Sequence, residues 1–130
     1  MVEANSNRKS ILVVEDEPNI AKVCVRTLNG EGFEVEVAAN GKVALDMLHQ
    51  KEYDLCLIDI RTPAMNGIEL YGHLEKSHPV MINRIVFSTG DVLSANIKTF
   101  LEKSNRPYLA KPFTPDELRA IVKTNLGIKV

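Results

Sequence analysis

The stretch Leu55-Cys-Leu-Ile-Asp59 decides the fold, because four apolar residues run without a break into a carboxylate. A short, almost continuously apolar run is expected of a central strand in a parallel sheet, since helices cover both faces of such a strand. The carboxyl ends of parallel strands in an open sheet gather at one edge, where ligands bind. Asp59 is therefore predicted to lie at the ligand-binding edge of the sheet.

Three further segments repeat this pattern of a short apolar run that ends at polar residues. They are Ile11–Val14 before Glu15-Asp16-Glu17, Ile85–Phe87 before Ser88-Thr89-Gly90, and Tyr108–Ala110 before Lys111-Pro112. If all four runs are strands of one parallel sheet, then acids, a hydroxyl and an ammonium from distant parts of the chain meet at one edge. This set of groups suits a divalent cation and a phosphoryl group.

Stretches of helical period alternate with the apolar runs. Helices are expected over 18–29, 43–50, from Asn66-Gly67 to before Pro79, over 93–103 and from Pro115. A fifth strand is expected over 34–39, and the run Ile85–Phe87 belongs to a strand expected over 83–88. The last helix has a capping signal, in which Thr114 caps, Pro115 takes the first position and Glu117 completes the capping box. The alternation predicts an α/β fold of the flavodoxin-like, doubly wound (βα)5 type, with a five-stranded parallel sheet of order 2-1-3-4-5.

Length and composition favour one ordinary globular domain. Residues 1–9 are expected to be a flexible leader and residues 10–130 a single domain, and the whole chain has 45% apolar and 25% charged residues. Sixteen basic residues face seventeen acidic ones without a basic block, which argues against direct nucleic-acid binding. No apolar run approaches the length of a membrane span. Cys24 and Cys56 fall within apolar patterns, which favours buried thiols in a reducing cytoplasm over a disulfide.

The adjacent acids Glu15 and Asp16 are the first candidate ligands of a cation. An isolated acidic pair is most often a solvated turn, but a third carboxylate, Asp59, is expected at the neighbouring strand end. Magnesium prefers oxygen ligands and commonly combines one or two carboxylates with water and a phosphate. The three carboxylates therefore predict a site for Mg²⁺, or for Mn²⁺.

Asp59 is the candidate nucleophile, since a carboxylate can attack phosphorus and form an acyl phosphate. Thr89 and Lys111 are expected to offer a hydroxyl and an ammonium to the same phosphoryl oxygens. Each of these two residues, taken alone, would be an ordinary strand or surface residue. The Lys111-Pro112 bond is a candidate cis peptide, because X-Pro is the usual place for one.

Together these residues resemble the receiver domain of two-component response regulators, the CheY-like family. The motifs that carry the resemblance are ILVVEDEP at 11–18, LCLIDIRTPAMNG at 55–67, IVFSTGD at 85–91 and YLAKPF at 108–113. They stand in the family's order, and the resemblance extends over about residues 10–127. Glu15 stands where Asp is commoner in the family, a variant that leaves the metal site intact.

The resemblance implies a phosphorylation switch rather than a metabolic enzyme. Asp59 would take a phosphoryl group from the phosphohistidine of a sensor histidine kinase or histidine phosphotransfer protein. Glu15, Asp16, Asp59 and the backbone carbonyl of Arg61 would hold the metal, and Thr89 and Lys111 would contact the phosphoryl group. The Lys111-Pro112 bond would be cis.

The resemblance also assigns the output. The ring of Tyr108 would turn inward when Thr89 moves toward the phosphate. The surface of the helix over 93–103, the strand over 108–110 and the last helix would then control a downstream protein or attached domain, and could form a dimer.

Arg61 and Asp91 occupy positions that flank the path of hydrolytic water in the family. We hypothesise that the two side chains approach each other across the site and lengthen the life of the phosphoryl group. The alternative interpretation of this pair is two independently solvated charges.

Three other functions are compatible with parts of the pattern. A docking scaffold that is never phosphorylated would use the same fold, but the sequence retains Asp59, Lys111 and the acidic pair. A flavin carrier would need a phosphate-binding loop where the chain has Glu15-Asp16-Glu17. A metal-dependent phosphohydrolase would need a general acid or base beside Asp59, where Ile60 and Arg61 offer none.

Overall fold

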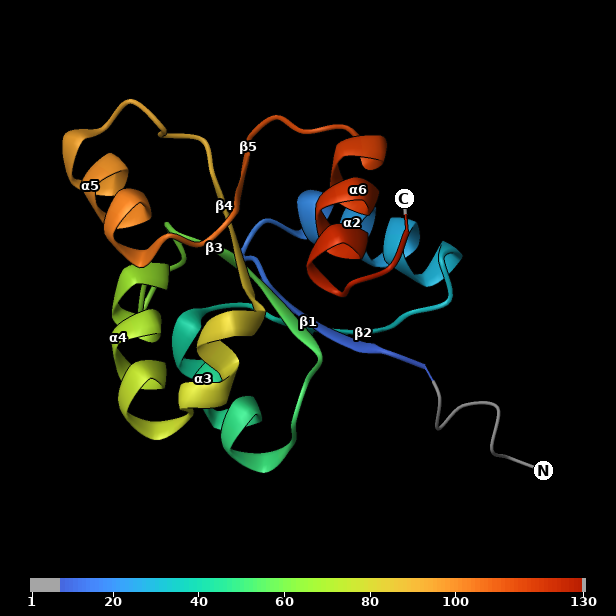
Figure 1. Ribbon diagram of the computed structural model, residues 1–130, viewed down its shortest axis with the longest axis horizontal. Coiled ribbons are helices and arrows are strands. Elements are labelled where there is room, and N and C mark those ends of the chain that lie inside the picture. The colour runs from blue at the N-terminus through green and yellow to red at the C-terminus, as the bar shows by residue number, and fades with distance from the viewer. Residues whose placement is uncertain (1–7, 130) are drawn as a thin grey trace.

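A five-stranded parallel sheet forms the centre of the computed structural model, which describes residues 8–129 (Figure 1). Its strands are β1 (Ser10–Val14), β2 (Glu34–Ala38), β3 (Leu55–Asp59), β4 (Ile85–Thr89) and β5 (Tyr108–Ala110). Their order is β2-β1-β3-β4-β5, and every neighbouring pair is parallel. The predicted flavodoxin-like sheet of order 2-1-3-4-5 is therefore confirmed.

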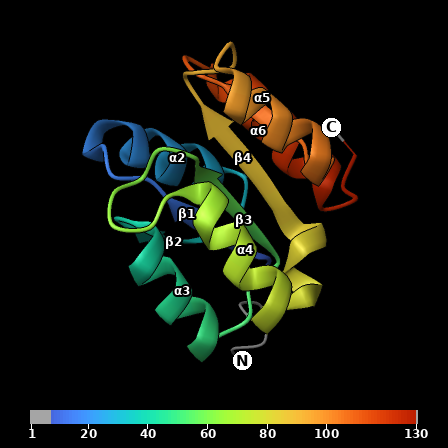
Figure 2. The same cartoon turned by 90° about the vertical axis from the view of Figure 1, so that its left-hand side faces the viewer.

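Helices cover both faces of this sheet. They are α2 (Pro18–Gly30), α3 (Gly41–Gln50), α4 (Gly67–Ser77), α5 (Ala95–Ser104) and α6 (Pro115–Asn125), with a 3-10 helix, η1 (Pro79–Arg84), before β4. Helices α2 and α6 lie together on one face, and α3, α4 and α5 lie on the other (Figures 1 and 2). Within residues 8–129, no helix has both the length and the apolar composition of a membrane span.

The apolar runs become the core because both of their faces are covered. All five residues of β3 are buried, as are those of β4. Alternate strand residues enter separate clusters on the two faces, so Cys56 packs toward α3 and α4, and Cys24 of α2 packs on the opposite face. Both cysteines are buried free thiols. Burial raises the pKa of Cys24 to about 11, which keeps this thiol protonated.

The predicted capping of the last helix is confirmed. The Thr114 hydroxyl accepts a hydrogen bond from the Glu117 amide at 3.1 Å, and the Glu117 carboxylate accepts one from the Thr114 amide at 2.8 Å. An equivalent capping box, which the sequence analysis did not identify, joins Asn66 and Glu69 at the start of α4. This second box ends the loop after β3 at a defined residue.

Three predicted boundaries were wrong by two residues. Helix α3 begins at Gly41 rather than at Val43, because Asn40 caps it. Asn83 and Arg84 belong to η1 rather than to β4, because Pro79 starts a tight 3-10 turn that ends only at Arg84. Helix α5 begins at Ala95 instead of Leu93, and the Leu93 side chain is 92% exposed. An apolar residue in the loop before a helix resembles the first residue of its buried face, and only packing distinguishes the two.

The start of the domain includes two residues of the predicted leader. The Arg8 guanidinium donates hydrogen bonds to the carbonyls of Gly32 and Phe33 at 3.1 and 3.2 Å, and the Glu34 amide donates to the Lys9 carbonyl. Residues 1–7 of that leader lie outside the described residues, as does Val130.

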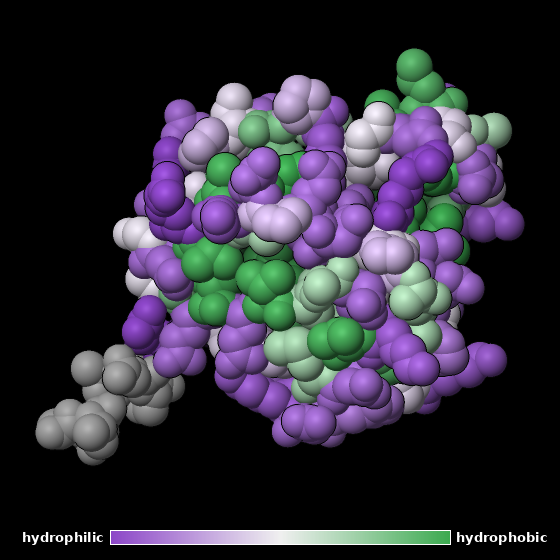
Figure 3. All heavy atoms as spheres, turned by 180° about the vertical axis from the view of Figure 1, so that it is seen from behind, coloured by the Kyte–Doolittle hydropathy of each residue, from purple (hydrophilic) through white to green (hydrophobic). Residues whose placement is uncertain are grey.

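The face seen from behind is mainly hydrophilic, with apolar groups in separate patches (Figure 3). Exposed apolar side chains include Val37 on the edge strand β2 and Val43 in the first turn of α3.

Candidate functional site

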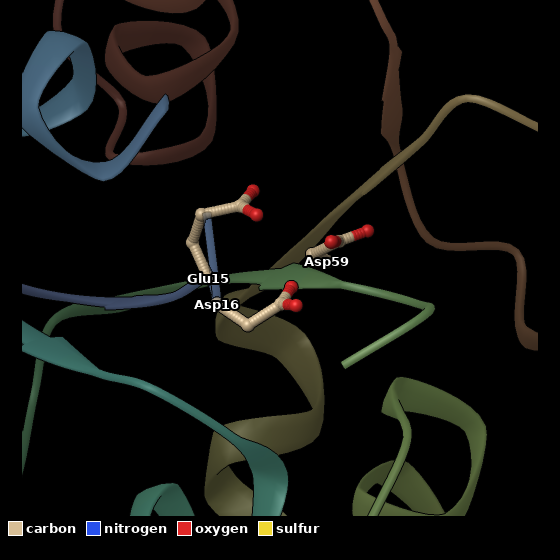
Figure 4. Close-up of side chains that lie close together, drawn as sticks. All are labelled: Glu15, Asp16 and Asp59. Carbon is tan, nitrogen blue, oxygen red and sulfur yellow. The ribbon is translucent and has the colours of Figure 1, made fainter. Parts of the chain in front are cut away.

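Three carboxylates meet at the edge where the strands end. Glu15 and Asp16 directly follow β1, Asp59 is the last residue of β3, and the two strands are neighbours in the sheet. Carboxylate oxygens of all three residues lie within 4.8 Å of one another. Figure 4 shows the side chains converging on one space from the two strand ends. Residues that are far apart in the sequence are thus brought together by the register of β1 against β3.

Glu15 lies in an environment that disfavours its negative charge. Glu15 is 4% exposed and Asp59 6% exposed, while Asp16 is open to solvent. Burial raises the pKa of Glu15, and the nearby Asp59 charge raises it further, while a hydrogen bond from Lys111 acts in the opposite direction. The charge of a bound cation would relieve this repulsion.

The donor set fits a hard divalent ion. All three side chains offer oxygen ligands, and one of them remains accessible from solvent, which leaves room for water and for a phosphoryl oxygen. A softer metal would prefer sulfur or imidazole ligands, and neither Cys nor His belongs to this cluster. We therefore assign Mg²⁺, or Mn²⁺, as the type of ion that these residues suit.

Lys111 reaches into the acidic cluster from the end of β5. Its Nζ lies 2.9 Å from Glu15 Oε1 and 3.1 Å from Asp59 Oδ2. The Lys111 amide donates to the Thr89 carbonyl at 2.8 Å, which extends the pairing of β4 with β5 and sets the position of the lysine. The Lys111-Pro112 bond is cis. Burial lowers the pKa of Lys111, but the contacts with Glu15 and Asp59 raise it by more. The pKa of Lys111 is therefore raised overall, and the ammonium keeps its charge.

Thr89 ends β4 beside the cluster. It is fully buried, and its hydroxyl accepts a hydrogen bond from the Asp91 amide at 3.0 Å. Its neighbour Ser88 pairs with Asp59 across β3 and β4. Tyr108, at the start of the edge strand β5, has 46% of its surface exposed. Thr89 is thus buried beside the acidic cluster, while Tyr108 is exposed to solvent over about half of its surface.

Arg61 and Asp91 form an ion pair beside the site. Their side chains connect the loop after β3 to the loop after β4. The Arg61 side chain is 64% exposed, and its amide donates to Asp59 Oδ1 at 3.3 Å. The pair therefore joins a residue whose amide contacts Asp59 to a residue that is hydrogen bonded to Thr89.

Two residues of the site region were missed from the sequence. The hydroxyl of Thr62, which is 4% exposed, donates to the Met65 carbonyl at 2.9 Å within the loop after β3. Gly41, which lies between the strand predicted over 34–39 and the helix predicted over 43–50, packs against that same carbonyl. The Asn40-Gly41 pair was a usable signal for Gly41, since a glycine at a helix start also permits close approach of another backbone. Thr62 carries no local signal.

Known proteins match this chain over almost its whole length. Residues 11–123 match the model of the response regulator receiver domain. The chain is 36% identical over 119 residues to the DNA-binding response regulator MtrA of Mycolicibacterium smegmatis, covering 92% of this chain and 51% of that protein. The chain thus spans about half the length of the curated relatives it matches.

Solved structures agree. A CheY-like receiver domain protein from Methanospirillum hungatei JF-1 superposes with a TM-score of 0.84 at 31% identity, covering 93% of this chain and 95% of that one. TrrA from Thermotoga maritima, solved in complex with Mg²⁺-BeF, gives 0.77 at 34% identity and covers 90% and 98%. The fold, the acidic strand ends and these matches show that the chain belongs to the response regulator receiver domain family, with the CheY-like fold.

Proposed function

We propose that Asp59 accepts a phosphoryl group from the phosphohistidine of a sensor histidine kinase or histidine phosphotransfer protein. The observation that carries this proposal is the convergence of Glu15, Asp16 and Asp59 within 4.8 Å, with Lys111 Nζ 3.1 Å from Asp59. An Asp59 oxygen forms the new bond to phosphorus while the bond from phosphorus to the histidine nitrogen breaks, which leaves an acyl phosphate.

Glu15, Asp16, Asp59 and the backbone carbonyl of Arg61 are the residues that would hold Mg²⁺ or Mn²⁺. When bound, the ion offsets negative charge on the transferring phosphoryl group and so reduces its repulsion by the Asp59 carboxylate. Lys111 supplies the second positive charge. Its ammonium donates to Glu15 and Asp59 in the unphosphorylated site and is close enough to turn to a phosphoryl oxygen.

Phosphorylation changes the output face through Thr89. We expect the Thr89 hydroxyl to leave the Asp91 amide and to donate a hydrogen bond to a phosphoryl oxygen instead. The loop after β4 then follows Thr89, and Tyr108 leaves its exposed position. The face formed by α5, β5 and α6 then contacts a downstream protein or attached domain, or a second copy of the chain. Addition of beryllofluoride and Mg²⁺ is expected to shift the NMR resonances of residues 89–94 and of the Tyr108 ring. Unchanged resonances at both places would contradict the coupling.

The Arg61–Asp91 ion pair lengthens the life of the acyl phosphate by hindering the approach of water. Arg61→Ala and Asp91→Ala should each accelerate dephosphorylation by roughly three- to tenfold, which is about 1 kcal/mol in the barrier. The double variant should be no faster than the faster single variant if the two side chains act as a pair. The dephosphorylation rate is measured as the loss of the phosphoryl group after the phosphodonor has been removed. Glu31→Ala, which removes an ion pair far from the site, should leave the dephosphorylation rate unchanged. Rates equal to wild type in both single variants would contradict this role.

As a receiver domain, the chain is a signalling protein and not a metabolic enzyme. We place its activity in the cytoplasm, where histidine kinases present their phosphohistidine, and its output in a protein contact rather than in direct binding of nucleic acid by this domain.

The proposal is tested by the intact mass of the wild-type chain after incubation with acetyl phosphate. One phosphoryl group should be added in the presence of Mg²⁺, and none in EDTA. Peptide mapping should place it in residues 55–67. No adduct with Mg²⁺ from acetyl phosphate or from a phosphorylated kinase would overturn the proposal and favour a docking scaffold that works without phosphorylation.

A further inference from the structure

The loop that connects β3 to α4, residues 60–66, rests on the first residue of α3. A Cβ atom at Gly41 would overlap the Met65 carbonyl oxygen and lie 2.8 Å from its carbon. Ordinary contact between carbon atoms is about 3.5–4.0 Å. Glycine is therefore the only residue type that fits at position 41 beneath the Met65 carbonyl. Figure 2 shows the loop passing beside the start of α3.

The same Met65 carbonyl is held from within the loop. The Thr62 hydroxyl donates to it at 2.9 Å, and Thr62 is 4% exposed. The Gly67 amide donates to the Ile60 carbonyl at 2.8 Å and closes the loop at its base. Ala64 has a φ of 67°, a conformation that costs a non-glycine residue free energy. These hydrogen bonds hold the loop in place although a residue in it is strained.

Helix α3 is held in place at its contact with the Met65 carbonyl. Asn40 caps the helix by accepting a hydrogen bond from the Val43 amide at 2.9 Å. Ala44 and Leu48 are buried in the core, with exposures of 0% and 4%. Because the helix is held at its first turn and along its buried face, a side chain at position 41 would displace the loop more readily than the helix.

We propose that Gly41 and Thr62 are positioning residues for the metal site: together they hold the Met65 carbonyl and so set the position of the loop that presents the Arg61 carbonyl to Mg²⁺. This inference rests on the proposed function. Neither residue touches the ion, and both act through the loop backbone. Residues that support a ligand in this indirect way typically change metal affinity by roughly ten- to a hundredfold when they are replaced.

The experiment measures Mg²⁺ affinity by calorimetry and, separately, the NMR spectrum of the full chain in EDTA. Gly41→Ala is expected to weaken Mg²⁺ binding by about tenfold or more, and Thr62→Val by a smaller factor in the same direction. Both variants should shift the metal-free resonances of residues 60–66 while those of α6 stay unchanged. Gly72→Ala is the matched control, because a Cβ there meets nothing within 4 Å, and it should bind Mg²⁺ as wild type does.

A folded Gly41→Ala variant with wild-type affinity and unshifted loop resonances would overturn the proposal. If Gly41→Ala does not fold, Thr62→Val decides, since it removes one hydrogen bond and keeps the shape of the side chain. Unchanged affinity and an unchanged spectrum for Thr62→Val would then overturn it. A wild-type chain that does not bind Mg²⁺ contradicts the proposed function instead. In that case the metal-free spectra alone decide whether Gly41 and Thr62 position the loop.

Discussion

Asp59→Asn will abolish phosphorylation of the chain. The amide of asparagine lacks the anionic oxygen that attacks phosphorus, so no acyl phosphate can form. The substitution keeps the size of the side chain and its position at the end of β3, where it is 6% exposed, and the fold should therefore persist. The intact mass after treatment with acetyl phosphate and Mg²⁺ is expected to stay that of the unmodified chain. Mg²⁺ affinity should also fall, because a charged ligand has been lost.

Asp46→Asn is the matched control for this experiment. Asp46 is an exposed residue of α3, away from the strand ends, and its variant should acquire one phosphoryl group at the wild-type rate. A phosphoryl adduct on Asp59→Asn equal to that of wild type would show that another residue is the acceptor. Such a result would contradict the assignment of Asp59 without contradicting the fold.

Lys111→Met should slow phosphorylation by about a hundred- to a thousandfold, the usual cost of removing one preorganised donor to a developing charge. Methionine retains an apolar stem of similar length but cannot neutralise a phosphoryl oxygen. The variant keeps all three carboxylates, so Mg²⁺ binding should survive. The rate constant for adduct formation, measured at saturating Mg²⁺, checks this expectation.

The same variant tests the structural role of the lysine. Lys111 Nζ contacts Glu15 and Asp59 at 2.9 and 3.1 Å, and its loss leaves both buried carboxylates without this cation. Removing one partner of a buried ion pair costs roughly 3–5 kcal/mol, and less here because the Lys111 side chain is 17% exposed. The free energy of unfolding, measured with denaturant in EDTA, should be lower for Lys111→Met than for wild type. Addition of Mg²⁺ should restore part of this difference.

Lys22→Met controls for the loss of one positive charge, since Lys22 is exposed on α2. It should phosphorylate and unfold as wild type does. A Lys111→Met variant with the wild-type rate would mean that the lysine serves only to balance the acidic cluster.

The sequence by itself determined the fold and the set of candidate site residues. Four of the five strands are short apolar runs that end at polar residues, while β2 alternates Val35 and Val37 with acids, and each of these signals is local. The capping box at Thr114 and Glu117 was readable for the same reason. The strand order and the meeting of Glu15, Asp16 and Asp59 followed from rules that apply to every open parallel sheet.

Only the tertiary structure decided the contacts that depend on packing between elements. The exposure of Leu93, the 3-10 turn before β4 and the close approach of Met65 to Gly41 are examples. No local pattern encodes them, because a distance between two backbones depends on how helices pack on the sheet, and a shift of a few tenths of an ångström there changes which residue fits. The residue types at the strand ends therefore specify the chemistry of the site, while the packing of its loops sets its geometry.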